Sequence, residues 1–129
     1  MPPVYTYDHV HLRSRDPMAT AQYYHKMFDA KILTSVQSDG QSRIDLDLNG
    51  LMVFIARVPA DAAIPSAPVE PYLGLDHLGL RVNNMAEAVA DLKQRGAEFV
   101  VEPRTIRPGV TIAFVRGPEN VRIELLERT

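Results

Sequence analysis

A six-residue motif occurs twice in this chain of 129 residues, and the repeat strongly limits the folds that the sequence can adopt. The stretch "DHVHLR" at residues 8–13 recurs as "DHLGLR" at residues 76–81, so that His9 aligns with His77. The offset of 68 residues is about half the chain. Self-similarity at a fixed spacing indicates that one structural unit has been duplicated.

The segment after each copy of the motif has the pattern of an amphipathic helix. In residues 15–29, Asp16 is suited to cap a helix and Pro17 to occupy its first turn. In residues 83–96, Asn84 is a second capping candidate and Gly96 lies just past the last apolar position. Each half therefore begins with a strand followed by a helix.

Three strand-like runs follow each helix. In the first half they are "AKILTSVQ", "SRIDLDL" and "LMVFIARV", and the last two are joined by Asn49-Gly50, a strong hairpin signal. In the second half they are "AEFVVEP", "VTIAFVR" and "VRIELLER". The sequence predicts an α+β fold of two βαβββ modules, over residues 4–58 and 75–128, with a proline-rich linker at 59–74 inside a single domain.

Composition excludes several classes of function. Fourteen Lys and Arg against sixteen Asp and Glu give a net charge of −2, which does not favour a nucleic-acid or anionic-membrane surface. Because there is no cysteine, disulfides, thiolate metal sites and cysteine nucleophiles are ruled out. No leader or spanning segment is recognised in the sequence, and we expect a cytoplasmic protein that binds neither nucleic acid nor membrane.

Side-chain alternation places the polar residues of the opening strands on one face. Val10 and Leu12 should face the following helix, which leaves His9, His11 and Arg13 on the opposite face. By the same alternation, His77 and Arg81 face away from the second helix. In the last strand, Glu124 stands between two apolar neighbours. This is a pattern of metal ligands, and equally that of an ordinary half-exposed sheet.

The run "SRIDLDL" carries charged residues at every second position. Asp45 or Asp47 would be a candidate base if this face lined a cavity. We expect instead a solvated sheet face.

The two motifs and the closing segment "FVRGPENVRIELLER" resemble the vicinal oxygen chelate superfamily. This superfamily includes glyoxalase I, extradiol dioxygenases, fosfomycin-resistance transferases and bleomycin-binding proteins. The resemblance covers nearly the whole chain. It implies that the modules form a curved mixed sheet around a cavity that holds a divalent metal ion.

Carried over by position, the resemblance implies metal ligands at His9, His77 and Glu124. The fourth position of the family falls on Phe54, which cannot bind metal and is expected to be a pocket wall. Two imidazoles and one carboxylate suit Fe, Mn, Zn, Ni or Co, and the sequence does not distinguish these ions.

Three further residues are candidates for the substrate pocket. His11 aligns with Gly79, so the repeat does not nominate it as a ligand. Its position fits a residue that hydrogen-bonds to substrate and equally one that merely lines a water-filled cavity. Arg13 and Arg81 are able to bind an anionic substrate, although structural salt bridges are the simpler explanation. No residue is nominated as the catalytic acid or base.

The resemblance implies three alternative functions. The first is a lyase, isomerase or transferase that binds a small substrate through two adjacent oxygens at the metal. The second is a non-haem Fe(II) dioxygenase of the extradiol type. The third is a protein that sequesters a drug or metabolite without catalysis. A small-molecule substrate and a homodimer are the expected partners.

Overall fold

The computed structural model describes residues 2–129 and contains two compact units, divided between Ala63 and Ile64. Each unit has the order βαβββ, and each forms its own four-stranded mixed sheet. The predicted α+β fold of two βαβββ modules is therefore confirmed. The grouping of the modules into one domain stays a prediction.

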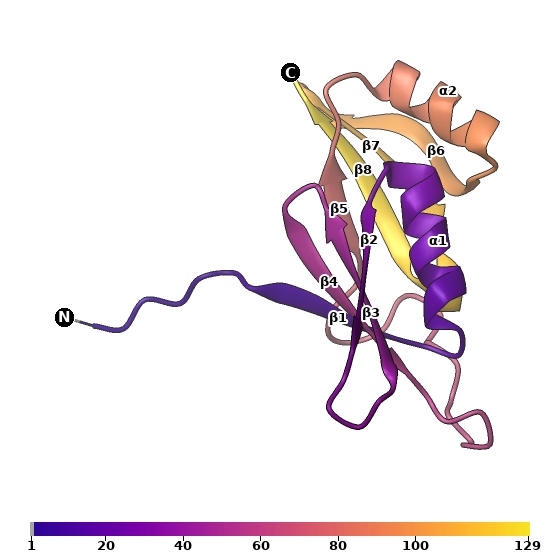
Figure 1. Cartoon of the computed structure of the whole chain (residues 1–129). Coiled ribbons are helices and arrows are strands. Elements are labelled where there is room, and N and C mark those ends of the chain that lie inside the picture. The colour runs from indigo at the N-terminus through magenta and orange to yellow at the C-terminus, as the bar shows by residue number, and fades with distance from the viewer. Residues whose placement is uncertain (1) are drawn as a thin grey trace. The chain divides into compact units, whose positions relative to one another are not determined.

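The first unit pairs its first strand with its last. Its elements are β1 (His9–Ser14), α1 (Pro17–Phe28), β2 (Lys31–Val36), β3 (Ser42–Leu48) and β4 (Leu51–Arg57). The strand order is β1-β4-β3-β2, with β1 parallel to β4 and the other pairs antiparallel. Residues 2–8 extend away from the sheet of this unit as an irregular segment (Figure 1).

Helix α1 forms where the capping residues allow it. The Asp16 side chain accepts a hydrogen bond from the Ala19 N–H, and the helix ends at Asp29, whose φ of 58° is left-handed. Tyr24 is completely buried on the inner face of α1. Burial raises the pKa of its hydroxyl, because the charged form would lose its hydration.

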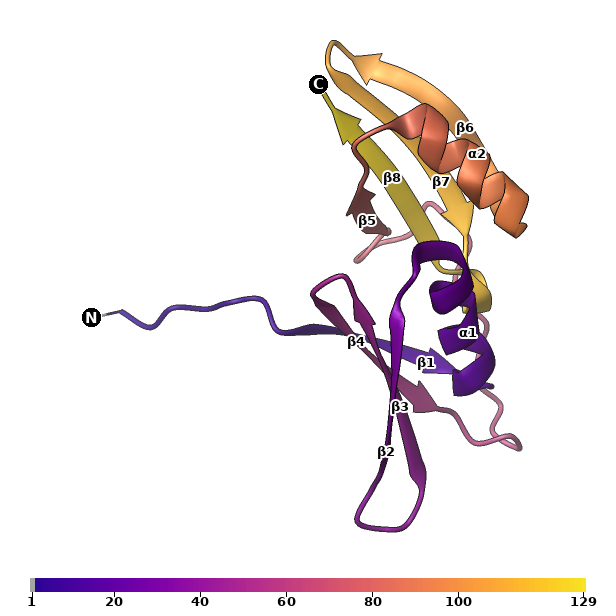
Figure 2. The same cartoon turned by 45° about the horizontal axis from the view of Figure 1, so that its top comes forward.

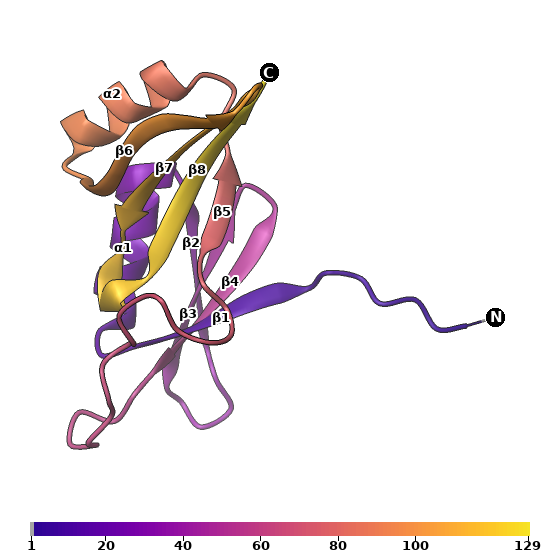
Figure 3. The same ribbon diagram turned by 180° about the vertical axis from the view of Figure 1, so that it is seen from behind.

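The second unit repeats this plan. Its elements are β5 (Leu78–Arg81), α2 (Met85–Arg95), β6 (Glu98–Arg107), β7 (Val110–Arg116), the short 3-10 turn η1 (Pro118–Asn120) and β8 (Arg122–Arg128). The strand order is β5-β8-β7-β6, and β5 runs parallel to β8 (Figure 3). Helix α2 packs along one face of this sheet, against β6 and β8 (Figure 2).

Local signals again determine the ends of α2. The Asn84 side chain accepts a hydrogen bond from the Glu87 N–H, and Gly96 ends the helix at a φ of 94°. Met85 and Leu92 are its buried residues. Because the helix covers one face of the sheet, the polar side chains of β5 and β8 are displayed on the other.

Two strands differ from the sequence-based expectation. Strand β5 begins at Leu78, the first residue that pairs with β8, so His77 lies just before the strand. Strand β6 runs through Pro103 to Arg107 instead of ending at the proline. An edge strand tolerates proline because one side of its backbone has no partner strand.

Residues 58–77 form no helix or strand, and the linker over residues 59–74 stays a prediction. Neither helix found in residues 2–129 is long and apolar enough to cross a membrane.

Candidate metal centre and adjoining pocket

The burial of the opening strands follows the predicted alternation. In β1, Val10 and Leu12 are half-buried, whereas His9, His11 and Arg13 are exposed. In β5, Leu78 and Leu80 are half-buried and Arg81 is exposed. The histidines therefore lie on the sheet face that the helices do not cover.

His77 and Glu124 converge in the second unit. The distance from His77 Nε2 to Glu124 Oε1 is 3.4 Å, and the exposed fractions of the two side chains are 31% and 15%. Two donors that bind one ion at right angles, each at about 2.1 Å, lie about 3 Å apart. The observed spacing is close to that value, so these two groups fit neighbouring ligand positions.

The space beside Glu124 depends on a glycine. Gly79 pairs with Glu124 across β5 and β8, and a Cβ at position 79 would lie 3.7 Å from Glu124 Oε1. Alanine fits at this distance, but a longer side chain would project over the carboxylate. Gly79 thus keeps the approach to Glu124 open.

His77 is held from behind by a second carboxylate. Its Nδ1 lies 2.7 Å from Asp76 Oδ2 and donates to that carboxylate, while Nε2 faces Glu124. Histidines that bind metal ions usually have such a partner on the other ring nitrogen. Arg122 Nη1 in turn donates to the same Asp76 oxygen at 2.6 Å.

Arg122 also packs against the ring that contacts His77. Its guanidinium lies 4.4 Å from the centroid of Phe114, and the Phe114 ring meets His77 edge to face at 5.0 Å. The Phe114 ring and the Asp76 hydrogen bond together hold the imidazole in place. Sequence reasoning missed Arg122, because the partners of an arginine on a strand depend on cross-strand neighbours that spacing does not reveal.

Glu70 continues this ionic network into the segment before β5. Arg116 donates to both Glu70 oxygens, with Nη2–Oε1 at 2.8 Å and Nη1–Oε2 at 3.4 Å, and Arg122 Nε lies 3.5 Å from Oε1. The hydrogen bonds from Arg116 lower the pKa of Glu70 from 4.5 to about 2, and they raise the pKa of Arg116.

His9 has the same kind of support in the first unit. Its Nδ1 lies 2.6 Å from Asp8 Oδ2, as the repeat of Asp-His would suggest. The two histidines differ in the residue that faces the imidazole ring. The Phe54 ring stacks on His9 with the centroids 4.1 Å apart, so this unit offers no carboxylate in the place where Glu124 stands.

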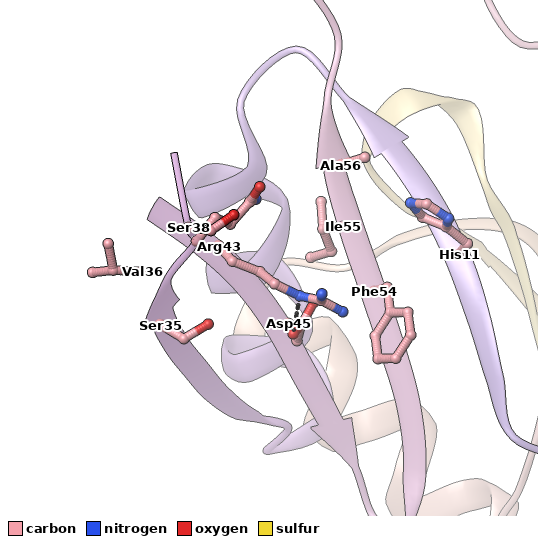
Figure 4. A pocket seen from close by; sticks show the side chains of 10 residues that line it. His11, Ser35, Val36, Ser38, Arg43, Asp45, Phe54, Ile55 and Ala56 are labelled. Carbon is pink, nitrogen blue, oxygen red and sulfur yellow. Dashed lines mark hydrogen bonds and ion pairs between the residues drawn. The ribbon is translucent and has the colours of Figure 1, made fainter. Parts of the chain in front are cut away.

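A pocket of about 640 Å³ lies on this face of the first unit. His11 and Phe54 line it, together with Arg43 and Asp45 of β3 (Figure 4). The expectation of a solvated face for "SRIDLDL" is wrong at Asp45, whose side chain is only 14% exposed. The neighbouring Arg43 and Phe54 cover it.

Other predicted residues lie elsewhere. Arg13 and Arg81 are exposed and do not line this pocket, and their roles stay predictions. In residues 2–129, no three His, Asp or Glu side chains are close enough together to form a complete metal site. His77 and Glu124 supply two fitting donors, and the third ligand, His9, stays a prediction.

These features define a class of protein. Two βαβββ units, each with a four-stranded mixed sheet, match the fold of glyoxalase-family proteins. A family model for the Glyoxalase/Bleomycin resistance protein/Dioxygenase superfamily matches residues 6–125. The chain therefore belongs to this superfamily.

Solved structures support the fold. A glyoxalase family protein from Enterococcus faecalis is similar with a TM-score of 0.72 and 26% identity, over 95% of this chain and 97% of that one. A domain of the same superfamily from Frankia sp. EAN1pec gives 0.76 and 24%, over 98% and 100%. The fosfomycin resistance protein FosX from Mesorhizobium loti gives 0.68 and 15%, over 98% and 95%.

Curated relatives match over shorter stretches. The lactoylglutathione lyases of Escherichia coli O157:H7 and Salmonella typhimurium are each 40% identical over 52 residues. That stretch is 40% of this chain and 38% of either enzyme, so the chain matches less than half the length of these relatives.

Proposed function

We propose that this protein is a divalent-metal-dependent enzyme that acts on a small substrate with two adjacent oxygens. The observation that carries the proposal is the convergence of His77 Nε2 and Glu124 Oε1 at 3.4 Å, with Nδ1 of His77 already engaged by Asp76. Histidines that bind metal ions are commonly held at the other ring nitrogen in this way, which supports an ion held by Nε2 and Oε1.

Three residues would hold the ion. They are His77 and Glu124, together with His9, which is proposed from its alignment with His77 and from the same support by the preceding aspartate. When bound, the ion would polarise a substrate carbonyl and stabilise an oxyanion. Asp76 fixes the ring of His77, and Arg122 fixes Asp76, so the chain's own contribution is to keep both donors oriented before any ligand arrives.

The similarity to lactoylglutathione lyases favours a lyase or isomerase reaction over other chemistry. A donor set of two histidines and one glutamate favours a second candidate, an Fe(II) dioxygenase of the extradiol type. We also propose a homodimer, on the basis of the family alone.

Metal titration tests the proposal. Metal-free protein is titrated with Mn²⁺, Fe²⁺, Co²⁺, Ni²⁺ and Zn²⁺ by isothermal calorimetry, Fe²⁺ without oxygen. We expect about one ion per chain, and a loss of at least about tenfold in affinity for His77→Ala and for Glu124→Gln. Asp47→Asn is the matched control, because Asp47 is a strand carboxylate outside the site whose Oδ1 accepts from the Gly50 N–H.

The result also separates the alternatives. If no ion binds, the enzyme proposal fails and a sequestering role is favoured. If Fe²⁺ binds, oxygen uptake with a panel of catechols distinguishes the dioxygenase from the lyase or isomerase. Uptake with a catechol would replace our first candidate by the second.

A further inference from the structure

The pocket of the first unit carries chemistry that the metal ligands do not explain. It lies on the helix-free face of the sheet, and Arg43 and Asp45 of β3 are the two charged residues that line it (Figure 4). The two residues are two positions apart on one strand, so their side chains project to the same face. Arg43 Nε donates to Asp45 Oδ2 at 2.8 Å.

This ion pair is incomplete on the side of the carboxylate. Asp45 Oδ1 is buried, and within residues 2–129 it has no hydrogen-bond partner. A carboxylate oxygen in that condition lacks the donor that it had in water, which is costly unless a ligand or a solvent molecule supplies one. A ligand that brings a donor to Oδ1, as the covering side chains move aside, would satisfy this oxygen.

Arg43 supplies the complementary group. Nε is used for Asp45, and the two Nη groups carry further N–H donors that suit a carboxylate. The guanidinium also lies 4.7 Å from the centroid of Phe54, which fixes it over the ring. Arg43 and Asp45 contact each other directly. A ligand that binds both must therefore carry its own acceptor and donor only a few covalent bonds apart.

Among the remaining lining residues, Ser35, Gln37 and Ser38 are polar, and the others are apolar or aromatic. Val36, Ile55 and Ala56 contribute aliphatic surface, and Phe54 and His11 contribute rings that meet edge to face with centroids 6.4 Å apart. A ligand that fits must therefore combine a compact polar end with an apolar or aromatic group.

We infer that this pocket binds carboxylic acids that bear a hydroxyl or ammonium group on the adjacent carbon and an apolar side chain. The carboxylate binds Arg43, and the neighbouring donor binds Asp45 Oδ1. That such a molecule is also the substrate rests on the proposed function, whereas its binding to Arg43 and Asp45 does not require a metal ion.

The test uses four related probes with the full chain in the presence of EDTA. These are 2-hydroxy-3-phenylpropanoate, phenylalanine, 3-phenylpropanoate and 3-phenylpropane-1,2-diol, and binding is measured by ligand-observed NMR titration. We expect the hydroxy acid, phenylalanine or both to bind at least about tenfold more tightly than the last two, which each lack one of the two polar groups. The first two probes show whether hydroxyl or ammonium is the preferred donor.

Variants of the two charged residues test whether the probes bind in this pocket. Arg43→Gln and Asp45→Asn should each weaken the preferred probe by at least about tenfold, whereas Asp47→Asn on the same strand should not change its affinity. Circular dichroism verifies that each variant is folded. Equal binding of all four probes, no binding of any, or equal losses in all three variants would overturn the inference. Because EDTA is present, these failures are independent of whether the metal site exists.

Discussion

The two units place the same kinds of side chain at exchanged positions. In the first unit, β1, β4 and β3 align His11, Phe54 and Asp45 in one cross-strand row. In the second unit, the equivalent row of β5, β8 and β7 contains Gly79, Glu124 and Phe114. An aromatic ring and a carboxylate have thus changed places between the two central strands.

The exchange separates two tasks. In the second unit the carboxylate stands beside the first strand, within reach of His77, and the aromatic ring supports that histidine. In the first unit the ring stands beside His9, and the carboxylate lies one strand further out with Arg43, in a pocket. One duplicated fold therefore offers a pair of metal donors in one unit and a polar pocket in the other.

The largest expected effect is a loss of stability when a buried side chain of α1 or α2 is truncated. Tyr24 is a fully buried residue of α1, so Tyr24→Ala should cost about 3–5 kcal/mol of unfolding free energy, close to the cost of other large core truncations. Leu92→Ala in α2 should cost about 2–5 kcal/mol. Urea denaturation followed by circular dichroism measures both.

A conservative variant sharpens that prediction. The Tyr24 hydroxyl is buried and has no hydrogen-bond partner in residues 2–129, so Tyr24→Phe should be neutral or stabilising. Because the pKa of this hydroxyl is raised by folding, wild-type stability should fall as the pH rises above about 10, where the unfolded tyrosine ionises. A large loss of stability in Tyr24→Phe at neutral pH would show that the hydroxyl has a partner.

The next effect concerns Arg122, which supports His77 without contacting the proposed ion. Arg122→Ala should weaken metal binding by about 10–100-fold, since Asp76 would lose the hydrogen bond that orients it. Long-range ¹⁵N NMR of the metal-free protein should also show a changed tautomer population of His77. Arg104→Ala, on the edge strand β6, is the control. An unchanged His77 spectrum would mean that Arg122 only stabilises the fold.

A smaller gain is expected from reversing the exchange in the first unit. Phe54→Glu puts a carboxylate where the second unit has Glu124, beside an aspartate-supported histidine. The full chain should then bind a divalent ion about tenfold more tightly. Phe54→Gln is the uncharged control, and calorimetry compares the two. Equal affinities of the two variants for the ion would show that a carboxylate at position 54 does not contact the metal.

The smallest effect is a pH dependence confined to the second unit. Folding lowers the pKa of Glu70 to about 2, so its ion pair with Arg116 stabilises the fold above about pH 4.5, and this contribution is lost as the pH falls toward 2. Glu70→Gln should lower the melting temperature at pH 7, with a difference from wild type that narrows on acidification. A constant difference would contradict the pKa assignment.

Local signals in the sequence predicted most of the fold. Asp16 and Asn84 cap their helices by side-chain hydrogen bonds, and Asn49 and Gly50 both have positive φ in the turn between β3 and β4, as two-residue hairpins require. The end of β6 was misplaced, because whether proline ends a strand depends on its position in the sheet.

The candidate site was predictable only in part. Alternation and the repeat, which can be read along the chain, placed His77 away from the second helix, whereas Glu124 was nominated by the family resemblance. The contacts of Arg122 with Asp76 and Phe114, and the burial of Asp45 by Arg43 and Phe54, depend on cross-strand partners. Residue spacing contains no information about such neighbours until the strand order is known.

Crystallography with anomalous scattering at the absorption edge of the added ion tests the central claim most directly. The account predicts one anomalous peak with His77 Nε2 and Glu124 Oε1 each about 2.0–2.2 Å from it. In crystals of the Glu124→Gln variant, it predicts no peak beside Phe54. A metal ion bound at other residues, or crystals that take up no ion at saturating concentration, would contradict the assignment of His77 and Glu124 as metal ligands.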